Sequence, residues 1–377
     1  MRDSLETICA HAGAIADKLT GAVTSPVYLS TTYNYEPTGE EPDGFVYTRL
    51  NNPTRSQLEQ ILTQLERGED AAAFASGSAA AQACFTSLSP GDHLIVNEDV
   101  YTGVRTMLLD IFIPWGLEVT FADLTDLQNL ERSIKPNTKL VWTESPTNPQ
   151  LGVVDLKKLI KSCKSRQIRV AIDNTFATPY SQNPLALGAD LVMHSTTKYL
   201  SGHSDVLGGA LITAKQDVQW EKIRQIQQIL GAVPSPFDCW LIMRGIRSFV
   251  PRMETHLKNA KAIAAFLDKH PMVEKALYPG LTSNSGYAIA KEQMRGSGAM
   301  VSILVKGGKK EAVLFIKNLK IFTNATSLGG TESLVEHRKS VEGPESPTPD
   351  SLVRMSIGLE NVDDLINDLD QALNGIK

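Results

Sequence analysis

Residues 169–176 read RVAIDNTF, and residues 190–205 read DLVMHSTTKYLSGHSD. The first segment contains a short apolar run that ends at Asp173, and the second contains another such run that is followed by Lys198. Runs with little polar alternation are typical of strands that are buried on both faces of a parallel sheet. Because such strands end at one edge of the sheet, we expect the carboxylate of Asp173 and the amine of Lys198 on the same edge.

Similar apolar runs occur throughout residues 71–213, with helix-like stretches between them. The runs outside the two segments above are AAAFA, HLIV, LEVTFA, KLVWTE and GGALIT. Apolar residues recur at helical spacing in residues 53–70 and from Asp155 to Lys164. This alternation predicts repeated βαβ units, and therefore an α/β fold with a mainly parallel sheet covered by helices on both faces.

The two ends of the chain have different patterns. Residues 1 to about 50 are rich in Thr, Tyr, Pro and Gly, and we expect an irregular arm that reaches across a neighbouring chain. Residues 238–270 are strongly helical in pattern and begin a second block, which ends in the strand MVSILVK and an amphipathic helix around VDDLINDLDQAL. The insert VEGPESPTPD at 341–350 is rich in Pro and predicts a loop. The expected domains are an arm at 1–60, an α/β domain at 61–235 and a smaller α+β domain at 236–377.

The composition argues against several kinds of partner. Lys and Arg number 37 against 42 Asp and Glu, and the net charge of -5 provides no basic field for nucleic acid. The four cysteines are far apart, the N-terminus lacks an apolar signal segment, and no apolar run is long enough to span a membrane. The histidines show no metal-ligand spacing, and we expect His194 and His203 to be structural hydrogen-bonding residues. We therefore expect a cytoplasmic protein without a metal, a nucleic-acid partner or a membrane partner.

An amine and a carboxylate on one sheet edge match the needs of pyridoxal 5'-phosphate (PLP). This cofactor needs a lysine for its Schiff base and an acid that keeps its pyridine nitrogen protonated. Asp173 and Lys198 would supply these groups, and the hydroxyls of Ser195 and Thr197 are available to a phosphate. The simpler alternative, a strand-end aspartate and a surface lysine that never meet, stays open on these residues alone.

Three further stretches place polar groups on the same expected edge. In AAAFASGSAAAQA, Gly77 and Ser78 begin an alanine-rich helix. The start of this helix is either a phosphate-binding site or an ordinary helix cap. In KLVWTESPTNP, a strand ends at Glu144 and the next loop presents Asn148, unless that loop is only a turn. Tyr101 follows the strand HLIVNED and would either stack on a cofactor ring or simply pack.

Taken together, these motifs resemble the Cys/Met-metabolism family of PLP-dependent enzymes. That family includes cystathionine γ-synthase, cystathionine γ-lyase, cystathionine β-lyase and methionine γ-lyase. The resemblance covers essentially the whole chain and rests on the order and spacing of VYLSTTY, YTRLNNPT, SGSAA, ESPTNP, AIDNTFATP, HSTTKYLSGHSD, DCWLIMRG, SLGGTES and LVRMSIGLE. It implies the PLP-dependent transferase fold (aspartate aminotransferase-like, fold type I), with a mainly parallel sheet and a smaller C-terminal α+β domain.

The resemblance also implies roles for residues around the cofactor. Lys198 resembles the Schiff-base lysine, Asp173 the pyridinium partner, and Tyr101 the ring-stacking tyrosine that also transfers protons. The positions that match the family's phosphate site are Gly77, Ser78, Ser195 and Thr197.

Other positions resemble those that complete the site and bind the substrate. Tyr47 and Arg49 match phosphate ligands that family members donate from a neighbouring subunit, which implies a homodimer as the minimal unit and a homotetramer of two such dimers. Arg354 matches the arginine that binds the substrate α-carboxylate through two parallel hydrogen bonds. Asn148 and Ser327 lie where the family places supporting contacts.

The implied reaction is elimination or replacement at Cγ of a small sulfur amino acid or homoserine ester, such as cystathionine or an O-acylhomoserine. Leu328 favours the γ-enzymes, because β-lyases tend to have a bulky aromatic residue at that position. Three departures leave the recognition of the distal substrate end open. Thr326 replaces a glutamate common in γ-enzymes, Arg105 stands one place before the arginine used for the distal carboxylate, and residues 335–350 replace a shorter His-containing stretch.

Several other functions stay open as alternatives. Cystathionine β-lyase and methionine γ-lyase belong to the same family, and an aminotransferase would use the same cofactor without a leaving group. A noncatalytic scaffold would have no need for the combination of Lys198, Asp173, Tyr101 and Arg354.

Overall fold

The computed structural model describes residues 3–39, 44–344 and 346–376 of the chain. These described residues form a seven-stranded sheet with the order β1-β7-β6-β5-β4-β2-β3. Its strands are β1 (Asp70–Phe74), β2 (His93–Asn97), β3 (Glu118–Ala122), β4 (Thr138–Glu144), β5 (Arg169–Asp173), β6 (Leu191–His194) and β7 (Gly209–Thr213). Each of these strands falls on one of the apolar runs of the sequence, so the predicted strands are confirmed.

Four strand pairs of the larger sheet are parallel, which confirms the mainly parallel α/β fold. Strands β3, β2, β4, β5 and β6 run in parallel, whereas β7 is antiparallel to both β6 and β1. The expectation that GGALIT belongs to a βαβ unit is therefore wrong. A parallel pair needs a crossover connection, and residues 195–208 between β6 and β7 form a loop instead of a crossover helix. That loop carries Lys198.

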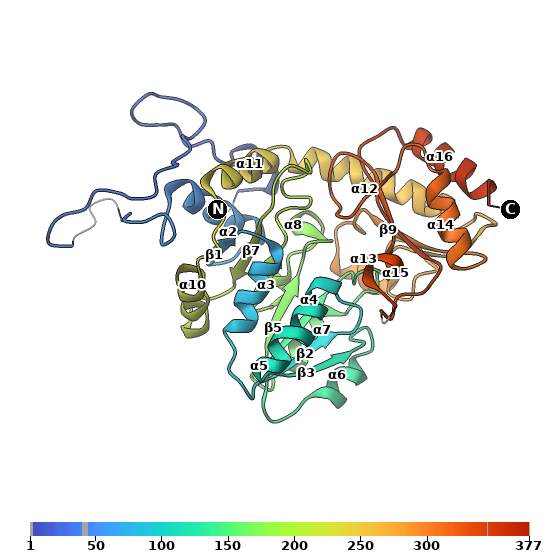
Figure 1. The fold of residues 1–377 in the computed structure, drawn as a ribbon, viewed down its shortest axis with the longest axis horizontal. Coiled ribbons are helices and arrows are strands. Elements are labelled where there is room, and N and C mark those ends of the chain that lie inside the picture. Colours follow the sequence, from blue (N-terminus) through green and yellow to red (C-terminus); the bar gives the residue numbers. More distant parts are fainter. Residues whose placement is uncertain (1–2, 40–43, 345, 377) are drawn as a thin grey trace.

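Helices cover both faces of this sheet (Figure 1). They are α2 (Pro53–Glu66), α3 (Gly77–Thr86), α4 (Thr102–Met107), the π-helix η1 (Leu108–Phe112), α5 (Ile113–Trp115), α6 (Leu127–Ser133), α7 (Leu156–Lys164), α8 (Thr178–Ser181), α9 (Pro184–Leu187) and α10 (Val218–Leu230). Within β4, Val141 belongs to one buried core, and Leu140 and Trp142 belong to the core on the other face. Both faces are therefore apolar, which explains the lack of polar alternation in the strands.

The predicted helix from Asp155 to Lys164 is confirmed, and the helix predicted over 53–70 forms but ends at Glu66, before β1 begins at Asp70. Capping residues set the start of each helix. The Asn52 side chain accepts hydrogen bonds from the backbone N–H groups of Thr54 and Arg55 at the start of α2. Asp155 accepts a hydrogen bond from the backbone N–H of Lys158 at the start of α7. Both caps satisfy donors that a helix start leaves unpaired.

The C-terminal block contains a second sheet of five described strands, in the order β10-β11-β12-β9-β8. Figure 1 shows it beside the larger sheet, with the long helix α12 running along both parts. Its elements are α11 (Pro236–Ile246), α12 (Phe249–Leu267), β8 (Val273–Leu277), α13 (Tyr287–Gln293), β9 (Met300–Val305), α14 (Lys309–Asn318), β10 (Thr323–Asn324), β11 (Leu334–His337), α15 (Arg338–Glu342), β12 (Leu352–Ser356) and α16 (Val362–Asn374).

The insert at 341–350 differs in part from the predicted loop. Its first two residues, Val341 and Glu342, complete the short helix α15, and Glu345 lies outside the described residues. The helix is stabilised by an ion pair between Arg338 and Glu342, which are one helical turn apart.

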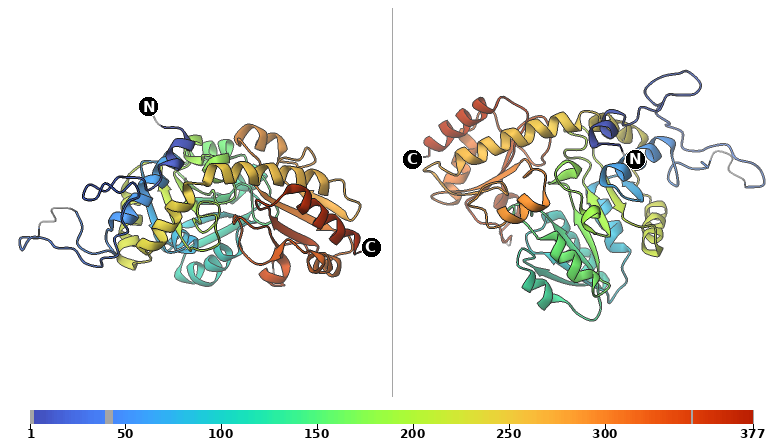
Figure 2. Two further views of the ribbon diagram at one scale, coloured as in Figure 1. Left: turned by 90° about the horizontal axis from the view of Figure 1, so that it is seen from above. Right: turned by 180° about the vertical axis from the view of Figure 1, so that it is seen from behind.

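The N-terminal segment begins with α1 (Leu5–Ala10) and continues as an irregular arm. Figure 2 shows the arm projecting away from the body of the protein. Side chains such as Leu19 and Val23 are 92% and 70% exposed, which is unusual for residues of this type. Residues 40–43 of the expected arm lie outside the described residues. Among the described helices, none combines the length and apolarity needed to cross a membrane.

Candidate active site

A cavity of about 200 Å³ lies where the carboxyl ends of β4, β5 and β6 meet the C-terminal block. Asp173 and Lys198 both line this cavity, as predicted for residues at one edge of the sheet. The cavity is also lined by other residues predicted for the site: Gly77, Ser78, Tyr101, Asn148, Ser195, Thr197, Ser327 and Arg354. Gly77 and Arg354, which are 277 positions apart in the sequence (354 − 77), are thus brought to one cavity.

The amine of Lys198 is held by a contact with the C-terminal block. Its Nζ donates a hydrogen bond to Ser327 Oγ at 2.7 Å. Desolvation lowers the pKa of Lys198 to about 8, and the charge of Arg354 acts in the same direction, whereas Glu336 and Asp173 partly oppose the shift. An amine with this pKa is substantially neutral near pH 8, and a neutral amine is a nucleophile and a base.

Ser327 reaches Lys198 through an unusual backbone conformation. Its φ of +97° is rare for a residue with a side chain, and Gly329 two residues later also has a positive φ of 78°. Such a conformation costs about 1–3 kcal/mol and is maintained only where the surrounding contacts support it. The hydrogen bond between Lys198 and Ser327 therefore depends on the positive φ that the turn gives to Ser327.

Asp173 lies next to a second carboxyl group, on the neighbouring strand β4. It pairs with Glu144 in the ladder between β4 and β5. Desolvation raises the pKa of Asp173, although hydrogen bonds from Thr175 and the charges of His194 and Lys198 oppose this shift. Desolvation and the charge of Asp173 together raise the pKa of Glu144 well above its usual value. We therefore assign the shared proton to Glu144 and the negative charge to Asp173.

Glu144 is a site residue whose position at a strand end was predicted but whose role was not. It is buried, it lines the cavity, and its Oε1 accepts a hydrogen bond from the backbone N–H of Tyr101 at 2.9 Å. This bond fixes the start of α4 and hence the position of the Tyr101 ring. Its place at the end of a strand was visible in the sequence, but its contact with Tyr101 was not.

The start of α3 packs closely against the loop that follows β6. A Cβ atom on Gly77 would lie only 2.9 Å from the Cβ of Ser195 and 3.0 Å from its Oγ. A Cβ on Gly209 would lie 2.2 Å from the backbone oxygen of Ser76. Glycine at both positions therefore allows the N-terminal end of α3 to approach the Ser195 hydroxyl. Backbone N–H groups at a helix start, next to hydroxyl groups, fit the phosphate of PLP.

Arg354 is buried in the opposite wall of the cavity. Its Nη1 donates to Asn148 Oδ1 at 2.9 Å, and its Nη2 donates to Glu336 Oε2 at 2.5 Å. Desolvation and the neighbouring charge of Arg338 lower the pKa of Arg354 to about 10, so the guanidinium stays charged at neutral pH. The geometry thus brings Asn148 and Arg354, for which the resemblance implies separate substrate contacts, into direct contact with one another.

The resemblance places Tyr47 and Arg49 in a neighbouring subunit's site and gives Arg105 no role in this cavity. Among the described residues, Tyr47, Arg49 and Arg105 do not line it. Arg49 Nη1 donates to the backbone oxygen of Gln228 at 2.5 Å. The Arg105 guanidinium lies over the ring of Phe121, 4.3 Å from its centroid.

The histidines singled out from the sequence form structural hydrogen bonds. His194 Nε2 lies 2.6 Å from Glu66 Oε1, and both side chains are buried. His203 Nδ1 lies 2.7 Å from the backbone oxygen of Ser201.

The sheet, the lysine in the loop after β6 and the strand-end aspartate define a PLP-dependent enzyme of fold type I. Residues 6–374 match the family model described as Cys/Met metabolism PLP-dependent enzyme. The chain therefore belongs to the Cys/Met-metabolism family of PLP-dependent enzymes. This confirms the predicted family, fold class and cofactor.

Individual relatives agree with this assignment. Cystathionine gamma-synthase of Mycobacterium tuberculosis is 44% identical, with 96% of this chain and 95% of that protein covered. Cystathionine gamma-lyase of Bacillus subtilis is 41% identical, with 98% and 99% covered. The crystal structure of metB from Corynebacterium glutamicum superposes with a TM-score of 0.96 at 41% identity and covers 100% of this chain and 99% of that one. The protein is thus a trans-sulfuration enzyme that acts on small substrates of sulfur amino-acid metabolism.

Proposed function

We propose that the protein catalyses γ-elimination or γ-replacement on cystathionine or an O-acylhomoserine. The observation that carries this proposal is the position of the Lys198 amine. It shares one cavity with the carboxylate of Asp173 and with the buried guanidinium of Arg354. A base, an acidic partner for the cofactor ring and a carboxylate-binding group are the parts that the reaction needs.

Four groups of residues would hold the cofactor. Bound PLP supplies an electron sink for the charge that develops at the substrate Cα. Lys198 would bind its aldehyde carbon, Asp173 would keep its ring nitrogen protonated, and the Tyr101 ring would stack on its face. The phosphate would be held by Gly77, Ser78, Ser195 and Thr197.

The remaining residues would bind the substrate and move its protons. Arg354 would bind the α-carboxylate with two parallel N–H bonds, and Asn148 would keep the guanidinium oriented. The Lys198 amine, with a pKa of about 8, would remove the Cα proton because its basicity matches the operating pH. Tyr101 would transfer a further proton, and Ser327 would keep the Lys198 amine directed into the cavity.

Reaction at Cγ is favoured over reaction at Cβ by the wall formed by residues 326–328. Thr326 and Leu328 line the cavity, and neither is a bulky aromatic side chain that would shorten it. Thr326 carries no charge, and Arg105 is directed at Phe121, so neither supplies a charge for the distal end of a substrate. We therefore propose weak binding of that end, with a high KM for cystathionine and tolerance of homoserine esters and other sulfur amino acids.

The test is the reaction of the holoenzyme with cysteine and an O-acylhomoserine. Purified protein should show an absorption band near 420 nm, as expected for a protonated PLP Schiff base. Formation of cystathionine, or of 2-oxobutanoate when cysteine is omitted, supports the proposal. Exchange of amino groups without a leaving group would support an aminotransferase, and a protein that stays colourless with added PLP would refute both.

We further propose a cytoplasmic homodimer as the minimal unit, assembled in pairs into a homotetramer. Tyr47 is 39% exposed and Arg49 lies outside the cavity of its own chain, which supports donation of both to a neighbouring subunit. The exposed apolar side chains of the arm support the same arrangement, because burial in an interface would remove them from water. The arm at 1–60 would then complete a site in the partner's α/β domain at 61–235, beside the α+β domain at 236–377.

A further inference from the structure

A chain of four alternating charges runs from α15 to the carboxylate-binding arginine. Arg338 donates from Nε and Nη2 to Glu342 Oε1 at 3.1 and 2.7 Å. Its Nη1 donates to Glu336 Oε2 at 3.1 Å, and the same oxygen accepts the 2.5 Å bond from Arg354. All four side chains are 3–5% exposed. The order of the chain is therefore Glu342, Arg338, Glu336 and Arg354, in a setting where water does not screen their charges.

The backbone fixes the inner end of this chain. Glu336 and Arg354 are directly opposite one another in the antiparallel ladder between β11 and β12. Side chains at such positions are neighbours on one face of the sheet, so Glu336 cannot move far from Arg354. Arg338 lines the cavity together with Arg354 and begins α15.

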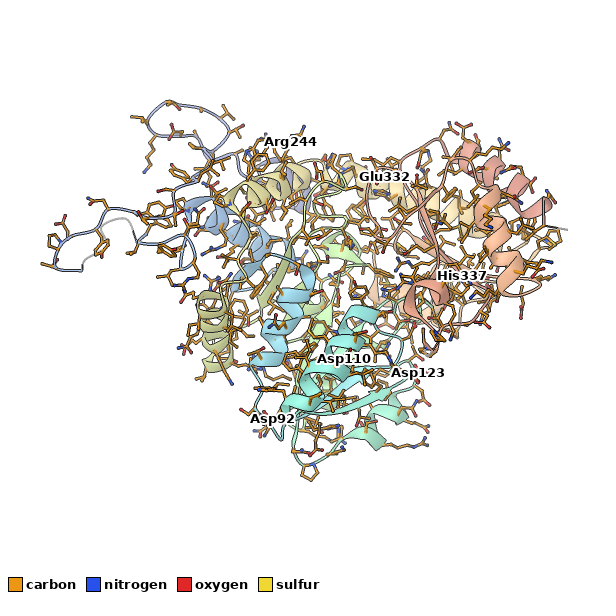
Figure 3. The ribbon with its side chains drawn as sticks, viewed as in Figure 1. Asp92, Asp110, Asp123, Arg244, Glu332 and His337 are labelled. Carbon is orange, nitrogen blue, oxygen red and sulfur yellow. The ribbon has the colours of Figure 1, made fainter. Side chains whose placement is uncertain are left out.

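The outer end is fixed by the insert that follows α15. Glu342 Oε2 accepts hydrogen bonds from Ser346 Oγ at 2.6 Å and from Thr348 Oγ1 at 2.5 Å. Burial alone would raise the pKa of Glu342, but these hydroxyl groups and the charge of Arg338 hold the pKa below its usual value. His337, labelled in Figure 3 next to α15, caps that helix and contacts the backbone oxygen of Asp350 at 2.7 Å.

Glu336 creates a difficulty for substrate binding. A carboxylate bonded to Arg354 competes with the carboxylate of a substrate for the same guanidinium. Without Arg338, the group of Arg354, Glu336 and Glu342 would have a net charge of -1, and a substrate carboxylate would be repelled. With Arg338, the net charge is zero, and Glu336 divides its hydrogen bonding between two arginines.

We propose that Arg338 is a positioning residue that keeps Arg354 available to a substrate carboxylate by sharing Glu336. This inference rests on the proposed role of Arg354 in the preceding subsection. Arg338 acts through Glu336, because its Nη1 donates to Glu336 while its Nε and Nη2 are held by Glu342.

The test compares two ligands that differ only in the carboxylate. L-norvaline and butylamine are titrated separately into the holoenzyme while the absorption spectrum of the cofactor is recorded. Arg338→Met should weaken binding of L-norvaline by about tenfold or more, because the Glu336 carboxylate would then compete undivided for the Arg354 guanidinium. Binding of butylamine should stay within about twofold, since it has no group for Arg354.

A second variant separates the charge effect from damage to the fold. Glu336→Gln combined with Arg338→Met removes the unpaired carboxylate, so it should recover most of the L-norvaline affinity lost in Arg338→Met. Arg338→Lys keeps the charge and should lose less affinity than Arg338→Met. Arg169→Met is the matched control, because Arg169 pairs with Asp217 far from the cavity. It should leave the ratio of the two affinities unchanged.

The outcomes distinguish this inference from the proposed function. Unchanged L-norvaline binding in Arg338→Met, equal loss of both ligands, or no recovery in the double variant would overturn the role of Arg338. A wild-type holoenzyme that binds both ligands equally would instead overturn the assignment of Arg354.

Discussion

Glu144 and Asp173 lie directly opposite one another at the ends of β4 and β5, and the desolvated pair carries one negative charge in our assignment. The proton on Glu144 lets its neighbour remain a carboxylate. Asp173 can then be the ionised partner of a protonated ring nitrogen, while Glu144 holds the backbone of Tyr101. Glu144 thus connects Asp173, which would hold the ring nitrogen of the cofactor, with Tyr101, which would stack on the face of that ring.

This assignment predicts the pH dependence of stability in Glu144→Gln. The folded-state pKa of Glu144 is raised, so the folded protein holds an extra proton, and wild-type stability falls as pH rises from about 5 toward that raised pKa. Glutamine mimics the protonated acid and should remove this part of the loss, at about 1.4 kcal/mol per pKa unit. Urea unfolding of the cofactor-free protein between about pH 5 and 8 measures the difference. If the unfolding free energies of the wild type and of Glu144→Gln changed in parallel with pH, Glu144 would be ionised in the folded protein.

The pKa of Lys198 predicts how fast the cofactor-free enzyme takes up PLP. Only the neutral amine attacks an aldehyde, so the rate should rise with pH and level off above about 8. An ordinary lysine with a pKa of 10.5 would give a rate that continues to rise beyond pH 9.5, which is one unit below that value. Stopped-flow absorbance across this range distinguishes the two curves.

Lys198→Ala should abolish turnover with little effect on the fold. Proton transfer by a positioned base contributes about 10²–10⁴-fold, and the covalent anchor for the cofactor is lost as well. Lys135→Ala is a matched control, because Lys135 pairs with Glu118 in an exposed ion pair away from the cavity. Steady-state rates and thermal unfolding should show a large loss of activity only in Lys198→Ala. Retention of more than a few per cent of activity would exclude Lys198 as the base.

Arg49→Ala tests whether two subunits build each site. The variant should lose cofactor more readily, because a phosphate ligand from the neighbouring subunit is missing. Mixing Arg49→Ala with Lys198→Ala subunits after mild dissociation should restore activity, since one site in each hybrid dimer has both residues intact. A mixture as inactive as its components would indicate a site built from a single chain.

The sequence predicted the cofactor edge of the site because strand direction alone determines it. Asp173 and Lys198 follow parallel strands, and parallel strands end at one edge. The direction of β7 was not predictable from its apolar pattern, because buried parallel and antiparallel strands look alike in sequence. The direction of β7 depends on the connection at 195–208, which contains no crossover helix.

The sequence patterns did not predict the contacts that the C-terminal block makes with the site. The bond between Lys198 and Ser327 joins residues 129 positions apart and depends on a positive φ at a serine. The bond between Arg338 and Glu336 depends on the five-residue helix α15, whose last two residues fall in the stretch 341–350 that was expected to be a loop. Arg105 stands one place before the arginine that family members use for the distal carboxylate. That position did not predict that the Arg105 guanidinium stacks on Phe121.

The central claim, γ-chemistry on a trans-sulfuration substrate, is tested most directly by identifying the keto acid that the holoenzyme forms from L-cystathionine. Cleavage at Cγ releases cysteine and 2-oxobutanoate, whereas cleavage at Cβ releases homocysteine and pyruvate. We expect 2-oxobutanoate as the main keto acid, and no release of it by Lys198→Ala. Pyruvate as the main product would contradict the assignment of the reaction to Cγ.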